Sequence, residues 1–194
     1  MDGNLVTLDS LIHTDSPSSG DLYFAYAANM HPEQMRQRCG VKQPLRIARL
    51  DDYRLAFHGY CAAWDSAHAT VAPSPGAAVW GVLYPLKDVD WERLDNAQDA
   101  RMDGSGAYFH YPVEVLDSEG RTHRARMYKF DVAGPATAPS AEFLDYLIAA
   151  AELRQLPADY LARLRSIAGK PAKYAVPRAL IAAPSGAGCE GCGE

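Results

Sequence analysis

The sequence predicts an α+β fold in which a small β-barrel, mostly antiparallel or mixed, is flanked by helices. Three observations lead to this prediction. Six or seven short apolar or alternating segments are bounded by turn residues, as in strands joined by hairpins. Helical patterns are inserted between these segments, and two more follow the last of them. With 194 residues, the chain has room for one complete hydrophobic core.

The strands follow one another closely along the chain. Asp51-Asp52 reads as a turn between two of them, and Pro73 to Gly76 reads as another turn. Residues 78–84 are apolar on both faces, which favours a central strand. Residues 118–120 make the turn of the last hairpin. The expected strands are residues 23–28, 46–50, 53–57, 69–73, 78–84, 108–115 and 124–130.

Four helices are expected, and capping residues mark the ends of several. Pro32 suits the first turn of one helix and Gly40 suits its end. Asp88 or Asp90 can cap the second, and Ser140 can cap the third. The expected helices are residues 32–38, 88–97, 142–154 and 159–167.

Composition and charge exclude several classes of protein. A net charge of −5 provides no basic surface for nucleic acid or for an anionic membrane. No segment approaches 18 uninterrupted apolar residues, and the N-terminus lacks the features of a secretory signal, so a cytoplasmic location is expected. We expect a flexible N-terminal arm at residues 1–20, one domain at residues 21–168, and an extended, flexible tail at residues 169–194.

The four cysteines fall into two groups. Cys39 and Cys61 are isolated, and we expect them to be reduced and in or near the core. Cys189 and Cys192 form a Cys-x-x-Cys pair in the glycine-rich tail. A zinc site needs two further ligands, and none is spaced nearby, so no metal site is predicted. The pair is interpreted as a mobile redox pair or as an incidental feature of the tail.

The stretch from Tyr23 to Met30 is the first candidate for function. An aromatic strand ends there in Ala27-Ala28-Asn29, shortly before a helix. Such a turn can present unpaired backbone N–H groups to an anion. The alternative is a core strand that runs into an ordinary loop.

Other patterns carry less information about chemistry. His58, His68, His110 and His123 have no helical spacing to one another, and single strand histidines are usually structural. No phosphate-binding, dinucleotide-binding or nucleophile-elbow fingerprint is present, so phosphate cofactors are not expected.

Five motifs, taken together and in order, resemble the gamma-glutamylcyclotransferase family over residues 21–167. They are Tyr23–Met30, Trp80–Tyr84, Leu94-Asp95, Gly106–Tyr108, and a late motif made of Pro139–Phe143 and Gln155–Tyr160. The resemblance implies a small barrel with a cavity at one end. It also implies intramolecular aminolysis, in which the α-amino group of a γ-glutamyl compound attacks its own γ-carbonyl. The products are 5-oxoproline and a free amine or amino acid, and no cofactor takes part.

The resemblance also implies how the substrate is held. The family's anchoring turn, Tyr-Gly-Ser-Asn, matches Tyr26, Ala27, Ala28 and Asn29, with Met30 completing the segment. Its backbone donors are retained here, whereas the serine hydroxyl is lost. Alanine at position 27 requires that the family's glycine position does not need a positive φ.

The family's catalytic glutamate matches Gln98, and further contacts match Tyr108, Tyr128 and Phe143, where the family usually has tyrosine at the last position. A glutamine amide cannot accept a proton near neutral pH. Three accounts of position 98 are open. Gln98 replaces a natural glutamate in a variant made to trap a ligand, Asp99 or Asp103 serves as the base, or the protein binds its ligand without catalysis.

These interpretations lead to two hypotheses of function. The first is a gamma-glutamylcyclotransferase-like enzyme that acts on a small γ-glutamyl amide or peptide, with position 98 as its acid–base site. The second is a non-catalytic module that binds a γ-glutamyl or amino-acid ligand on the same fold. Neither nucleic acid nor a membrane is an expected partner, and the chain is expected to be a monomer or a homodimer.

Overall fold

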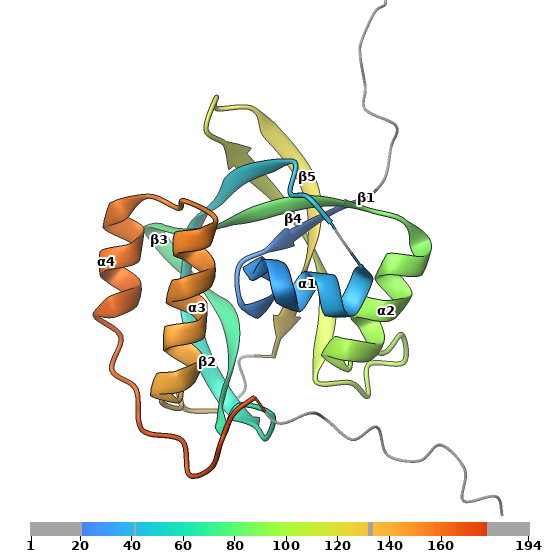
Figure 1. The fold of residues 1–194 in the computed structure, drawn as a ribbon. Helices are drawn as coiled ribbons and strands as arrows, with labels where there is room; N and C mark the ends of the chain where they lie inside the picture. The colour runs from blue at the N-terminus through green and yellow to red at the C-terminus, as the bar shows by residue number, and fades with distance from the viewer. Residues whose placement is uncertain (1–20, 41, 132–133, 178–194) are drawn as a thin grey trace, which may run out of the picture.

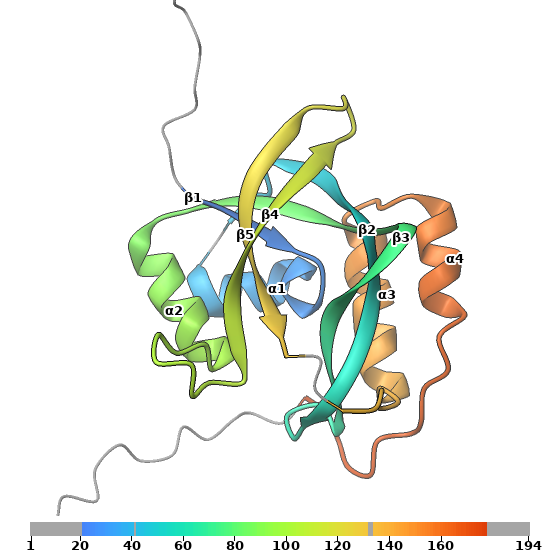
Figure 2. The same cartoon turned by 180° about the vertical axis from the view of Figure 1, so that it is seen from behind.

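The computed structural model describes residues 21–40, 42–131 and 134–177, in which five strands form a closed barrel. The order around the barrel is β1-β3-β2-β4-β5 (Figure 2). Every pairing is antiparallel except that of β5 with β1, which is parallel and closes the barrel. The predicted mixed barrel is therefore confirmed. The strands are β1 (Asp21–Ala25), β2 (Arg46–Cys61), β3 (Ser66–Leu86), β4 (Tyr108–Asp117) and β5 (Thr122–Phe130).

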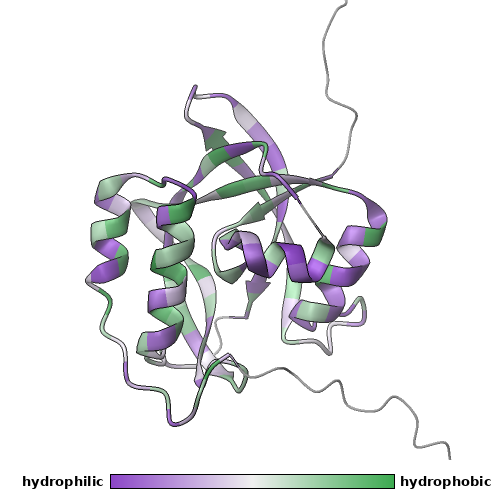
Figure 3. Ribbon diagram, in the orientation of Figure 1, coloured by the Kyte–Doolittle hydropathy of each residue, from purple (hydrophilic) through white to green (hydrophobic). Residues whose placement is uncertain are grey.

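The helices lie in two pairs on the flanks of the barrel (Figure 1). α3 and α4 lie side by side on one flank, and α1 and α2 lie on the other. In Figure 3, α3 is largely hydrophobic and α1 largely hydrophilic, as expected if α3 covers more of the core. The helices are α1 (Pro32–Cys39), α2 (Asp88–Gln98), α3 (Ala141–Leu153) and α4 (Ala158–Arg165), and a short 3-10 turn, η2 (Ala28–Met30), precedes α1.

The prediction of six or seven strands was wrong, because two expected turns are bulges within long strands. Asp52 adopts a left-handed conformation with φ 61°, and Gly76 has φ 77°. The Asp52 carboxylate accepts a hydrogen bond of 2.8 Å from the Gly76 N–H, and the register between β2 and β3 shifts at this point. The two residues bend the paired strands without ending the ladder. Four expected strands therefore merge into β2 and β3.

Capping explains where α2 and α3 begin. Ser140 is the N-cap of α3, and its hydroxyl accepts a hydrogen bond of 3.3 Å from the Phe143 N–H, as predicted. The carboxylate of Asp90 accepts the N–H of Lys87, the residue before α2, at 3.1 Å. Of the two predicted caps, Asp90 therefore makes this contact. Asp90 also pairs with Lys42 at 2.8 Å.

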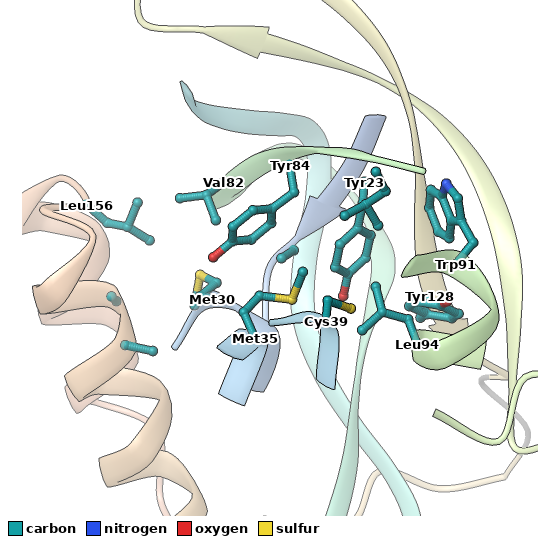
Figure 4. Packing of buried hydrophobic residues seen from close by; sticks show 14 of the residues in the cluster. Tyr23, Met30, Met35, Cys39, Val82, Tyr84, Trp91, Leu94, Tyr128 and Leu156 are labelled. Carbon is teal, nitrogen blue, oxygen red and sulfur yellow. The ribbon is translucent and has the colours of Figure 1, made fainter. Parts of the chain in front are cut away.

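The largest core cluster joins the barrel to its helices (Figure 4). Tyr23 packs edge-on against Trp91 of α2 and Tyr128 of β5. Cys39 is buried there, and neither Cys39 nor Cys61 is in a disulfide among the described residues. The predicted N-terminal arm and the Cys189–Cys192 pair lie outside the described residues.

The first part of the predicted tail is described and contacts the domain. The Lys173 N–H donates a 2.6 Å hydrogen bond to the Asp65 carboxylate, and the Ala172 N–H donates to Glu142 at 2.9 Å. Residues 169–177 thus lie against the barrel and α3. The domain end at residue 168 stays a prediction.

Candidate functional site

A cavity of about 320 Å³ lies between η2, the β2–β3 hairpin, the end of α2 and the start of β4. It is large enough for an amino-acid-sized ligand. All but one of the site residues expected from the sequence border it: Tyr26, Ala27, Ala28, Asn29, Gln98, Tyr108, Tyr128 and Phe143. The fold therefore brings together segments that are more than 100 residues apart in the sequence.

The turn after β1 borders the cavity and leaves two backbone N–H groups without an acceptor among the described residues. The Met30 N–H bonds to the Ala27 carbonyl at 2.8 Å, and the His31 N–H bonds to the Ala28 carbonyl at 3.0 Å. The N–H groups of Ala28 and Asn29 have no acceptor among the described residues. Ala27 has φ −129°, so this position does not need the positive φ that favours glycine, and alanine fits where the family motif has glycine.

Asn29 holds the turn in place through both ends of its amide. Its nitrogen donates to the Tyr23 hydroxyl at 2.7 Å, and its oxygen accepts from Nη1 of Arg38 at 2.6 Å. Only 3% of the Asn29 surface is exposed. Burial raises the pKa of Tyr23, so this hydroxyl stays protonated. The amide is therefore fixed between a neutral phenol and a cation.

Gln98 ends α2 with its amide oxygen 2.7 Å from Nη1 of Arg38. Arg38 lies in the last turn of α1 and borders the cavity. The sequence analysis did not identify Arg38 as a site residue. Its contacts lie 9 and 60 residues away in the chain, so no local pattern marks it.

The two aspartates considered as replacement bases are occupied or distant. Asp99 borders the cavity, but its carboxylate binds Arg101 Nε at 2.9 Å and the Ala107 N–H at 3.2 Å. The Arg101 guanidinium lowers the pKa of Asp99. Asp103 does not border the cavity; it accepts hydrogen bonds from the backbone and hydroxyl of Ser105. Neither geometry favours a base role.

His68 is a titratable cavity residue that the sequence analysis did not select. Its Nδ1 lies 3.2 Å from the Tyr108 hydroxyl, and its ring stacks on Phe130 with centroids 4.4 Å apart. Burial lowers the pKa of His68 from its ordinary value, although the Tyr60 carbonyl opposes this shift. At neutral pH the imidazole is therefore uncharged and able to accept a proton.

Two tyrosine hydroxyls, one just after β1 and one on β5, are bound to fixed partners. The Tyr26 hydroxyl donates to the Tyr128 carbonyl at 2.6 Å, and the Tyr128 hydroxyl donates to Asp95 at 2.5 Å. The same Asp95 oxygen lies 2.5 Å from Nε2 of His110. Burial raises the pKa of Tyr128, as does its hydrogen bond to Asp95. These tyrosines shape the cavity as neutral, immobilised groups.

Phe143 and Met30 occupy different environments. Phe143 forms a wall of the cavity and packs against Trp64, with ring centroids 5.1 Å apart. Met30, by contrast, does not border the cavity: its side chain is 1% exposed and lies beside Met35 and Tyr84 in the core (Figure 4). Met30 contributes through its backbone, because its carbonyl oxygen accepts a hydrogen bond of 2.7 Å from Arg154 Nε.

Two other kinds of site are absent from the described residues. No group of three or more His, Cys, Asp and Glu side chains there is arranged to hold a metal ion. No helix in this part of the chain has the length and apolar character needed to span a membrane.

Comparison with known proteins agrees with this geometry. The AIG2-like family model matches residues 78–164. Gamma-glutamylcyclotransferases of Bos taurus and Homo sapiens are each 29% identical over 150 residues, covering 75% of this chain and 78% of theirs. A solved gamma-glutamyl cyclotransferase structure superposes with a TM-score of 0.74 at 28% identity, covering 80% of this chain and 92% of that one. The chain is gamma-glutamylcyclotransferase-like in sequence and fold.

A more distant structure shares the gamma-glutamylcyclotransferase-like fold alone. YkqA of Bacillus subtilis superposes with a TM-score of 0.64 at 20% identity, over 77% of this chain and 55% of its own.

The structure also explains the glycine at position 106, in the loop before β4. A Cβ atom on Gly106 would lie 2.1 Å from the Asp99 carbonyl oxygen, so only glycine fits where the loop passes the end of α2.

Proposed function

We propose that this protein is a gamma-glutamylcyclotransferase-like enzyme that cyclises the γ-glutamyl part of an amide or peptide to 5-oxoproline. One observation supports the proposal above all: the anchoring turn, Tyr26 to Asn29, borders the same cavity as position 98. The α-amino nitrogen forms a bond to the γ-carbonyl carbon, and the bond from that carbon to the leaving nitrogen breaks. The attacking ammonium loses two protons as it becomes the lactam N–H, and the leaving nitrogen gains two as it departs as an ammonium.

Substrate orientation supplies much of the rate in this scheme. The Ala28 and Asn29 N–H groups receive the α-carboxylate of the glutamyl group. With that end fixed, the aromatic walls, including Tyr108 and Phe143, hold the chain folded so that the amine faces its own carbonyl. An intramolecular attack in such a geometry gains several kcal/mol, about 7 or more in favourable model reactions.

We assign the proton transfer to His68, because the Gln98 amide has no useful basicity. The imidazole is neutral near pH 7, and its Nδ1 reaches the Tyr108 hydroxyl at 3.2 Å. In this proposal the Tyr108 hydroxyl, which also contacts the Ala69 carbonyl at 3.2 Å, relays a proton from the substrate to His68. In this proposal Gln98 positions Arg38 and takes no proton.

Product analysis tests the proposal. A panel of γ-glutamyl amines and peptides is incubated with the unaltered protein and with the His68→Asn and Gln98→Glu variants, and 5-oxoproline and glutamate are measured. We expect 5-oxoproline from the unaltered protein, a loss of about 10²-fold or more in His68→Asn, and a higher rate in Gln98→Glu. Asp103→Asn, an exposed aspartate outside the cavity, is the matched control and should retain its activity.

Two outcomes would overturn the proposed cyclisation. The first is that no compound yields 5-oxoproline, even with a Gln98→Glu protein whose cooperative unfolding shows that it is folded. The second is release of glutamate in place of 5-oxoproline, which would identify a hydrolase.

A second candidate function is a non-catalytic module that binds a γ-glutamyl or amino-acid ligand. The neutral amide of Gln98, at the position of the family's base, favours it. Calorimetry with glutamate and 5-oxoproline distinguishes the two, because a module would bind without turnover in both the unaltered and the Gln98→Glu proteins.

A further inference from the structure

Arg38 is a cation at the cavity, and its hydrogen-bond partners among the described residues are all amides. Nη1 donates to the oxygens of Asn29 and Gln98 at 2.6 and 2.7 Å. When the amide oxygen of Gln34 faces Arg38, it accepts hydrogen bonds from Arg38 Nε at 2.9 Å and from Arg38 Nη2 at 2.6 Å. This orientation satisfies both ends of the Gln34 amide. The guanidinium is therefore held by several hydrogen bonds, and no negative charge contacts it in the part of the chain that the structure describes.

No carboxylate neutralises Arg38 among the described residues. The ion pairs among these residues are made by cations other than Arg38. One of them is Arg36, on the same helix, which pairs with Glu33. Burial lowers the pKa of Arg38, yet a guanidinium stays protonated at neutral pH. Amide dipoles stabilise such a charge less than a counter-charge does. The missing counter-charge can come from a ligand in the cavity.

Arg38 and the anchoring turn act on the same region of the cavity. Asn29 contacts Arg38 through its side chain, and its own backbone N–H is one of the two donors of the turn without an acceptor among the described residues. A single carboxylate can therefore receive the N–H groups and the field of the guanidinium together. A glutamate at position 98 would instead place a carboxylate within the protein beside Arg38.

We propose that Arg38 provides the positive charge for a ligand carboxylate and that Gln98 keeps this charge available. The ligand class is amino-acid-like monocarboxylates, such as 5-oxoproline, and γ-glutamyl compounds with a free α-carboxylate. The inference goes beyond the proposed cyclisation, because it concerns binding and holds with or without turnover. One residue difference from the family motif thereby removes a base and leaves the charge of Arg38 available to an anion at the anchoring turn.

Calorimetry with 5-oxoproline and its neutral carboxamide, which is nearly the same size, tests this inference. We expect the unaltered protein to bind the acid about tenfold or more tightly than the amide. In Arg38→Gln this preference should fall, because only the uncharged N–H groups of the anchoring turn remain. In Gln98→Glu the affinity for the acid should fall by about tenfold or more, because the internal carboxylate competes for Arg38.

Arg36→Gln is the matched control. It removes the same charge from the same helix, but Arg36 is exposed and paired with Glu33. Its acid-to-amide preference should equal that of the unaltered protein. The inference is overturned if the unaltered protein binds both compounds equally, or if Gln98→Glu binds the acid as tightly as the unaltered protein.

Gln98→Glu keeps the test decisive if Arg38→Gln does not fold, because glutamate and glutamine are almost the same size. The proposed cyclisation is measured separately as 5-oxoproline formed, so either idea can fail alone.

Discussion

Arg38 and Gln98 join the ends of α1 and α2 through a hydrogen bond of 2.7 Å between Nη1 and Oε1, across 60 residues of sequence. The contact connects a charged donor to a neutral acceptor at the wall of the cavity. Replacing that acceptor with a carboxylate changes the local charge and almost nothing in shape. Position 98 therefore offers a controlled way to separate binding, catalysis and stability.

The Gln98→Glu variant should be more stable than the unaltered protein at neutral pH. The new carboxylate pairs with the guanidinium of Arg38, and we expect about 1 kcal/mol in the free energy of unfolding, measured by urea denaturation at pH 7. Arg38 lowers the pKa of the introduced carboxyl group in the folded state. The gain is therefore complete above the unfolded pKa, about 4.3, and disappears as the pH falls through the folded value.

A double-mutant cycle provides the control for this prediction. In an Arg38→Gln background, Gln98→Glu should give no gain at pH 7. Equal gains in the presence and absence of Arg38 would show that the ion pair is not their source.

The rate of 5-oxoproline formation should depend on the protonation of His68. Because burial lowers the pKa of His68, kcat/KM should rise with pH, reach half its maximum below about pH 6.5, and be constant near pH 7. The measurement is product formation between about pH 4.5 and 8, a range that spans the ordinary pKa of histidine. His68→Asn should remove this rise, and an identical pH profile in that variant would exclude His68 as the base.

Ala27→Gly should destabilise the protein without weakening ligand binding. Ala27 has φ −129°, so the folded state does not need the positive φ that favours glycine, and a glycine mainly adds freedom to the unfolded chain. We expect a loss of about 0.4–1 kcal/mol in urea denaturation. Binding of 5-oxoproline should be unchanged, because the Ala28 and Asn29 N–H groups remain. An increase in stability would mean that position 27 is strained with alanine.

Leu147→Ala should be severely destabilising. Leu147 of α3 is 1% exposed and packs in the cluster that contains Phe143 and Trp64, next to the cavity. Truncation leaves a void, and we expect a loss of about 2–5 kcal/mol in the free energy of unfolding. Leu153→Ala, on the same helix but 58% exposed, is the matched control and should change stability by less than about 0.5 kcal/mol. Similar losses in both variants would contradict the assignment of the core.

The sequence predicted the fold well because its signals are local. The apolar pattern of residues 78–84 and the cap at Ser140 depend on near neighbours, and the structure retains both. Asp52 and Gly76 misled the prediction for a physical reason. Residues that favour a positive φ occur both in turns and in bulges, and only pairing across the sheet distinguishes the two.

The candidate site was predictable only in part. The Tyr26–Asn29 turn and Gln98, which the motifs single out, border one cavity, and their roles stay predictions. Met30 belongs to the same motif, but the 3-10 turn directs its side chain into the core. Arg38 could not be found, because its partners come from other elements of the fold.

The parallel closure of β5 on β1 has a consequence for synthesis of the chain. Tyr23 pairs with Arg126, so the first strand must wait for the last one before the barrel closes. Phe143, which completes the wall of the cavity, emerges later still. A nascent chain released from the ribosome before α3 would therefore lack the complete cavity. Ligand binding would report that synthesis and folding have both passed that point.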